Sequence, residues 1–139
     1  MLLVVDANIV ISSLIAGKLE HIIFSPKLEL IAPDLLFTEI RRHKAEILSK
    51  SKLSGLEFEM LMALLETKIK SIPIEEFILL LPEAERLLGE HKKDAPYIAL
   101  ALKFNCSFWS YEKRFKKVSK VESLTTSDVR LRLSDSAFQ

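Results

Sequence analysis

The feature that most constrains the fold is a continuous apolar run at residues 2–5, which ends abruptly in Asp6. No polar residue alternates with the apolar ones, so a strand formed by this run is suited to burial on both faces. Strands of this kind are typical of parallel sheets that are covered by helices. The run therefore predicts a buried parallel sheet with Asp6 at the end of its first strand.

Further short apolar runs alternate with helical patterns along the chain. Residues 28–32 and 106–109 are the next best strand candidates, and residues 71–74 and 121–124 are weaker ones. Helices are predicted over residues 8–16, 19–24, 34–47, 58–69, 84–88 and 95–104. Strands that alternate with helices predict an α/β fold, a sandwich with a central, mainly parallel sheet.

The composition is that of one small globular domain. The chain has 139 residues, of which 49% are hydrophobic, and this is enough to bury a core. We therefore expect a single domain over residues 1–139. The one cysteine, Cys106, lies in an apolar run, which excludes an internal disulfide and a cysteine-based zinc site and is typical of a reducing compartment.

No apolar stretch approaches the roughly 18–20 residues that cross a bilayer, and Asp6 interrupts the first run before it could form a signal peptide. We expect a soluble cytoplasmic protein without membrane association. Twenty Lys and Arg against nineteen Asp and Glu give a formal net charge of +1, so overall charge does not indicate nucleic acid binding. His21, His43 and His91 lack zinc-binding spacing, and we expect surface roles for them.

Four acidic residues are placed where strand ends and helix starts would meet. Asp6 ends the first strand, and Asp94 begins the apolar helix. Glu112 follows the strand at 106–109, and Glu39 lies inside a helix. In open parallel sheets, ligands bind at the edge where carboxyl ends of strands meet helix N-termini. Singly, the aspartates could cap a helix or lie in a turn, and the glutamates could be solvated.

A magnesium or manganese ion suits such a cluster, because it accepts carboxylate oxygens and so removes their mutual repulsion. A water on the metal can become the nucleophile toward a phosphodiester, with no covalent intermediate on the protein. The amide of Asn8 and the hydroxyl of Ser110 could orient a carboxylate or a water. A helix N-cap is an equally good interpretation of Asn8.

Segments around these acidic residues resemble the PIN-domain family, which includes the VapC-type toxins of bacterial and archaeal toxin–antitoxin pairs. The segments are Val4-Val5-Asp6-Ala7-Asn8, Thr38-Glu39-Ile40, the run from Asp94 to Ala101, and the run from Trp109 to Phe115. Each motif is weak alone, and their order over nearly the whole chain is fairly specific. At the position of Glu112 the family more often has Asp.

The resemblance implies a three-layer α/β/α fold and a metal-dependent ribonuclease that hydrolyses RNA phosphodiester bonds. It places Asp6, Glu39, Asp94 and Glu112 at the acidic positions of the family. It also implies a protein antitoxin as a possible partner. Since PIN proteins are often dimers, it favours a homodimer, to which an exposed part of the apolar stripe around Met62 could contribute.

A basic segment directly follows the expected metal edge. It contains no acid between Lys113 and Lys120, and its basic residues are Lys113, Arg114, Lys116, Lys117 and Lys120. These charges could guide RNA phosphates, while Trp109 or Tyr111 could stack a base if exposed. A solvated basic face is an equally good interpretation, and Arg41, Arg42 and Lys44 raise the same choice on the helix that bears Glu39.

Two other classes of function compete with the nuclease. A non-catalytic RNA-binding or scaffold protein could keep the same fold, because carboxylates alone do not prove turnover. An aspartate-nucleophile phosphatase also has an acid after the first strand, but it usually needs a second acid where this chain has Asn8. The chain has only three glycines and no phosphate-cradling glycine motif, which disfavours nucleotide-binding folds.

Overall fold

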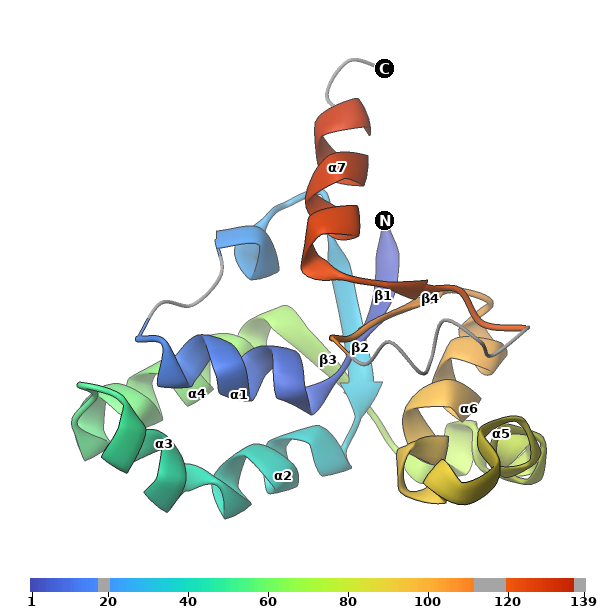
Figure 1. Cartoon of the computed structure of the whole chain (residues 1–139), viewed down its shortest axis with the longest axis horizontal. Coiled ribbons are helices and arrows are strands. Elements are labelled where there is room, and N and C mark those ends of the chain that lie inside the picture. Colours follow the sequence, from blue (N-terminus) through green and yellow to red (C-terminus); the bar gives the residue numbers. More distant parts are fainter. Residues whose placement is uncertain (18–20, 112–119, 137–139) are drawn as a thin grey trace.

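The computed structural model of the chain describes residues 1–17, 21–111 and 120–136 (Figure 1). Its centre is a five-stranded sheet in which every neighbouring pair of strands is parallel. The order across the sheet is β3-β2-β1-β4-β5. The strands are β1 (Leu2–Val5), β2 (Glu29–Pro33), β3 (Ile69–Ile72), β4 (Ser107–Trp109) and β5 (Ser123–Leu124).

Helices connect the strands and cover the sheet. The α-helices are α1 (Ala7–Ile15), α2 (Leu35–Arg42), α3 (Lys44–Lys50), α4 (Gly55–Lys68), α5 (Leu81–Leu88), α6 (Ala95–Phe104) and α7 (Thr126–Ser136). Short 3-10 helices are η1 (His21–Phe24), η2 (Ile74–Glu76), η3 (Ile78–Leu80) and η4 (Gly89–Asp94). None of the helices within the described ranges is long and apolar enough to cross a membrane.

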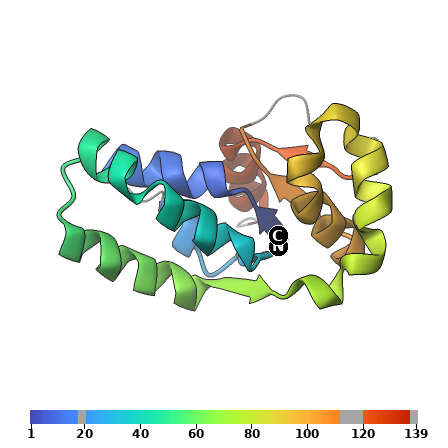
Figure 2. The same cartoon turned by 90° about the horizontal axis from the view of Figure 1, so that it is seen from below.

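The helices form two layers, one on each side of the sheet. Figure 1 shows α1 to α4 on one side of the strands and α5 and α6 on the other. The contacts agree with this view, because α1 packs against α2 and α3, while α6 packs across β1, β2 and β4. Seen from below, α4 runs directly into β3 along one edge of the molecule (Figure 2). The predicted three-layer α/β/α sandwich with a parallel sheet is therefore confirmed.

The core explains why the first apolar run becomes a central strand. Leu3, Val4 and Val5 are at most 1% exposed, with β2 and β4 as neighbours and helices on both faces. The predicted apolar helix at 95–104 is also confirmed, since α6 has those bounds and buries six of its residues. Both segments are apolar on all sides because each is surrounded by other elements.

The helical layer of α2 to α4 corrects two predictions. The helix expected over 34–47 is interrupted at His43, which separates α2 from α3. The helix expected over 58–69 is α4, which begins three residues earlier, at Gly55. Its buried side carries Phe58, Met62 and Leu65, while the apolar residues Leu56, Met60 and Leu64 are exposed.

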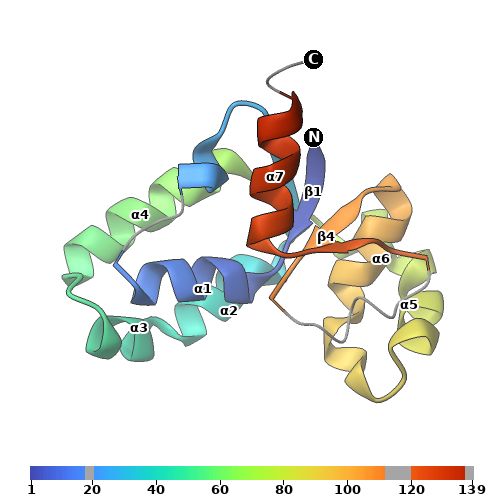
Figure 3. The ribbon, with the colours of Figure 1, turned by 45° about the horizontal axis from the view of Figure 1, so that its top comes forward.

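The remaining differences lie at the sheet edges. The strand expected at 71–74 is β3, which starts two residues earlier, at Ile69 directly after α4. Helix α7 was not predicted, and its end lies near the start of β1 (Figure 3). Arg132 on α7 binds Glu122, beside β5, through two hydrogen bonds of 2.8 Å. The buried Trp109 indole also donates to Thr126, the first residue of α7, at 3.0 Å.

Candidate functional site

The carboxyl ends of β1 and β4 meet at the centre of the sheet. The chain adds β2 and β3 on one side of β1, then returns to place β4 and β5 on the other side. A position where the strand order reverses is where open α/β sheets bind ligands, because the two connections leave in opposite directions. Asp6 and Ser110 directly follow these two strands, since Val5 is paired with Trp109.

The Asp6 side chain is fixed between the two strand ends. It is only 4% exposed, and its Oδ2 accepts a hydrogen bond of 2.7 Å from the Ser110 hydroxyl. The Asp6 backbone N–H donates to the Trp109 carbonyl at 3.0 Å, and the Ser110 N–H donates to the Leu124 carbonyl at 3.0 Å. Backbone bonds on both residues thus hold the carboxylate and hydroxyl in place.

Asp6 also caps the helix that follows it. Its Oδ1 accepts a hydrogen bond of 3.4 Å from the Asn8 backbone N–H, at the N-terminus of α1. Asn8 is the second residue of this helix and is exposed, so the interpretation of Asn8 as the N-cap is wrong. A carboxylate at a helix N-terminus is favoured by the unpaired N–H groups and the helix dipole.

Glu39 comes to the same region from α2, the helix that follows β2. Its side chain is half-buried, and its pKa is raised by burial, then by repulsion from Asp6 and Asp94. Tyr97 and Arg42 oppose this rise. Asp6 and Asp94 thus both act on Glu39 through their charge, although each is 33 or more residues away from it in sequence.

Asp94 lies at the start of α6, the helix that crosses β1, β2 and β4. It occupies the N-cap position, but its side chain makes no capping hydrogen bond. A helix-capping hydrogen bond therefore does not explain why an acidic residue occupies this position. The Asp94 side chain is half-buried, and its charge raises the pKa of Glu39. Of the described acids predicted for the site, Asp6 and Asp94 therefore both act on Glu39.

Tyr97 is a part of this cluster that the sequence reasoning missed. It is 1% exposed, and its hydroxyl oxygen is the one buried side-chain polar atom in the described part of the chain without a hydrogen-bond partner. Burial, then the charges of Glu39, Asp6 and Asp94, raise its pKa far above the usual value. The sequence did contain an indication of this role, because Tyr97 follows Asp94 by three residues. Side chains at this spacing lie on the same face of a helix.

The chemistry of these donors fits a hard divalent cation. Carboxylate oxygens are the ligands that magnesium and manganese prefer, and a cation would offset the repulsion of Glu39 by Asp6 and Asp94. The Tyr97 hydroxyl, which lacks a hydrogen bond of ordinary geometry, is influenced by the same three carboxylates. Within the described ranges, no three acidic, His or Cys side chains are arranged to hold an ion by themselves. Glu112, the fourth predicted acid, lies outside the described residues.

The residues predicted to bind RNA differ in whether the structure describes them, and the described ones differ in their ion pairs and exposure. Lys113, Arg114, Lys116 and Lys117 lie outside the described residues. Lys120 binds Glu83 at 2.6 Å, and Arg41 contacts both Glu59 oxygens, at 2.7 and 3.1 Å. Trp109 is 0% exposed, so it cannot stack on a base, whereas Tyr111 is 45% exposed.

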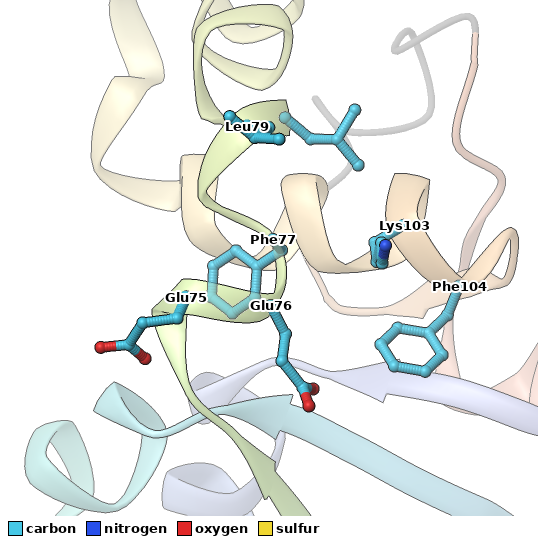
Figure 4. Close-up of a pocket in the computed structure, with 7 residues that line it drawn as sticks. Glu75, Glu76, Phe77, Leu79, Lys103 and Phe104 are labelled. Carbon is cyan, nitrogen blue, oxygen red and sulfur yellow. The ribbon is translucent and has the colours of Figure 1, made fainter.

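A hollow of about 660 Å³ lies apart from the acidic cluster (Figure 4). It is formed between the segment after β3 and the end of α6, and is lined by Glu75, Glu76, Phe77, Leu79, Leu80, Lys103 and Phe104. In Figure 4 the carboxylates of Glu75 and Glu76 lie at one side of it. None of the lining residues is one of the predicted site residues.

Comparison with known proteins identifies the family of the chain. Residues 4–134 match the model of a family described as PIN domain. This match spans nearly the whole chain and includes all four predicted acids. No curated protein matches the sequence.

Proposed function

Because the chain belongs to the PIN-domain family, whose members are generally nucleases of the hydrolase class, we propose that it is a divalent-metal-dependent endoribonuclease. The observation that supports this most is the convergence of Asp6, Glu39 and Asp94 from three separate elements on one edge of the sheet. A structural role would not require three repelling carboxylates to be partly buried together.

In this proposal Asp6, Glu39, Asp94 and Glu112 hold magnesium or manganese. The ion would supply a water of lowered pKa and neutralise charge on the scissile phosphate. Ser110 fixes the orientation of Asp6 through its 2.7 Å hydrogen bond. Asn8 is exposed beside Asp6 and could contact a water or the substrate through its amide.

RNA would be held through its phosphates by basic side chains. Lys113, Arg114, Lys116 and Lys117 follow Glu112 directly in the sequence, so we propose that they contact phosphates. Arg42 is a further candidate, because it acts on Glu39. Arg41 is less suited to this role, since Glu59 already neutralises it.

The proposal includes two protein partners and a cytoplasmic location. A protein antitoxin would make the chain the toxin of a pair, as the likeness to VapC-type toxins suggests. A homodimer is supported by the exposed apolar stripe on α4, where Leu56, Met60 and Leu64 are 72%, 60% and 52% exposed. Residues four apart lie on one face of a helix, so this stripe is a continuous surface.

The alternative is a non-catalytic RNA-binding protein with the same fold. Glu112 favours this alternative, because the longer side chain can displace a metal ligand from the position that Asp gives it. The two proposals differ in one measurable respect, since both predict RNA binding but only the nuclease predicts RNA cleavage that requires metal.

The test is cleavage of mixed RNA by purified wild-type protein and Asp94→Asn, with manganese, magnesium or a chelator. We expect wild-type cleavage with metal and none with chelator. Asp94→Asn should fold but not cleave, because Asn keeps the size of Asp without its charge. Asp34→Asn is the matched control, since Asp34 also precedes a helix without a side-chain capping bond. RNA binding without cleavage by the wild type would instead favour the non-catalytic alternative.

A further inference from the structure

The Tyr97 hydroxyl is buried, has no hydrogen bond of ordinary geometry, and is influenced by the charges of Glu39, Asp6 and Asp94. Buried polar groups in proteins almost always have hydrogen-bond partners, and one without a partner calls for an explanation such as an absent ion. Tyr97 is only 1% exposed, so bulk water cannot be the hydrogen-bond partner of its hydroxyl.

The ring of Tyr97 is held in place by packing. It lies 5.9 Å from the Phe108 ring at an interplanar angle of 40°, and Phe108 is a fully buried residue of β4. Neighbouring residues of α6 are buried as well. The hydroxyl therefore cannot turn away to find a partner, and any partner must come to it.

Glu39 is the group best placed to become that partner. It is only half-buried, and its long side chain has rotamer freedom that Tyr97 lacks. The Tyr97 hydroxyl lies beside the Glu39 carboxylate and lowers its pKa as a hydrogen-bond donor does, although no hydrogen bond of ordinary geometry joins the two groups. Asp6 and Asp94 both repel the Glu39 carboxylate, and a cation held by the acids would offset this repulsion.

We propose that Tyr97 is a positioning residue, whose hydroxyl donates a hydrogen bond to the Glu39 carboxylate when a divalent cation is bound and so orients Glu39 as a ligand. This inference rests on the metal-dependent function proposed above. Groups that donate to metal-ligating carboxylates fix their orientation, and their removal typically weakens metal binding about 10–100-fold.

The test compares wild type, Tyr97→Phe and Tyr111→Phe as full chains. Both substitutions remove only a hydroxyl, and Tyr111 is the exposed tyrosine beside Ser110, which makes it a matched control. Manganese binding is measured by calorimetry, and thermal unfolding is measured with chelator. For Tyr97→Phe we expect about tenfold weaker manganese binding. Its unfolding temperature without metal should equal or exceed that of wild type, because the variant loses an unsatisfied buried group.

The outcomes separate this inference from the proposed function. Equal manganese affinity of wild type and Tyr97→Phe would overturn the inference alone. A lowered unfolding temperature of Tyr97→Phe with chelator would assign the hydroxyl a structural role and also overturn it. If wild type itself binds no manganese, the proposed function fails and the inference fails with it.

Discussion

The hydrogen bond between Ser110 and Asp6 gives the sharpest prediction about stability. Ser110→Ala removes the donor from a carboxylate that is 4% exposed, and water cannot easily replace it. A hydrogen bond to a buried charged group contributes about 1.5–3 kcal/mol. We therefore expect the free energy of unfolding to fall by about that amount in the metal-free protein.

The predicted change in unfolding temperature follows from the size of the chain. An unfolding entropy of about 2.1 cal/mol/K per residue over 139 residues means that 1 kcal/mol shifts the midpoint by about 3–4 °C. Ser110→Ala should therefore lower the unfolding temperature by about 5–10 °C. The assay is thermal unfolding followed by circular dichroism, with chelator present.

Ser107→Ala is the matched control for this prediction. Ser107 is the first residue of β4, the strand that Ser110 directly follows, and it also donates a 2.7 Å hydrogen bond to a carboxylate, that of Glu122. This bond is exposed, and Glu122 keeps its two bonds to Arg132. The control should change stability by no more than about 0.5 kcal/mol. Equal losses in the two variants would refute the reasoning that burial makes the Ser110 bond the stronger one.

Three further predictions concern charge and the exposed stripe of α4. The raised pKa of Glu39 means that its stabilising contribution is present below the unfolded pKa and is lost as pH rises, so with chelator Glu39→Gln should gain stability relative to wild type as pH rises above about 4.5. A stability difference that does not change with pH, measured by thermal unfolding, would contradict this. Neutralising Lys116 and Lys117 should weaken RNA binding, as measured by fluorescence anisotropy. It should also reduce the slope of log affinity against log salt concentration by about 0.7 per lost phosphate contact. An unchanged slope would mean that these two lysines do not contact RNA. Met60→Glu should convert a dimer to a monomer in light scattering, whereas Leu131→Glu, an equally exposed control on α7, should not.

Much of the sheet could be predicted from the sequence, because its strands coincide with short runs of apolar residues. The run before Asp6 is apolar without alternation, and this pattern occurs in strands that are buried on both faces. The same reasoning placed Asp6 and Ser110 at strand ends, and the parallel pairing of β1 with β4 brings them into contact. The order of the motifs indicated the family, and the match over residues 4–134 confirms it.

Features that depend on tertiary contacts could not be predicted in this way. The break at His43 leaves the apolar spacing of Ile40 and Ile47 intact, so the pattern alone suggests one helix. Helix α7 is polar over most of its length and is anchored by distant partners, as in the bond between Trp109 and Thr126. The unpartnered hydroxyl of Tyr97 likewise exists only because three separate elements meet around it.

The central claim is that the acidic residues on this edge of the sheet hold the metal, and calorimetric titration with manganese tests it most directly. Wild type should bind at one cluster, and an Asp6→Asn and Asp94→Asn double variant should lose this binding because two ligands become neutral. A Glu75→Gln and Glu76→Gln double variant removes the same charge from the separate hollow and should bind as wild type does. Unchanged manganese binding by the folded Asp6 and Asp94 variant would contradict the account.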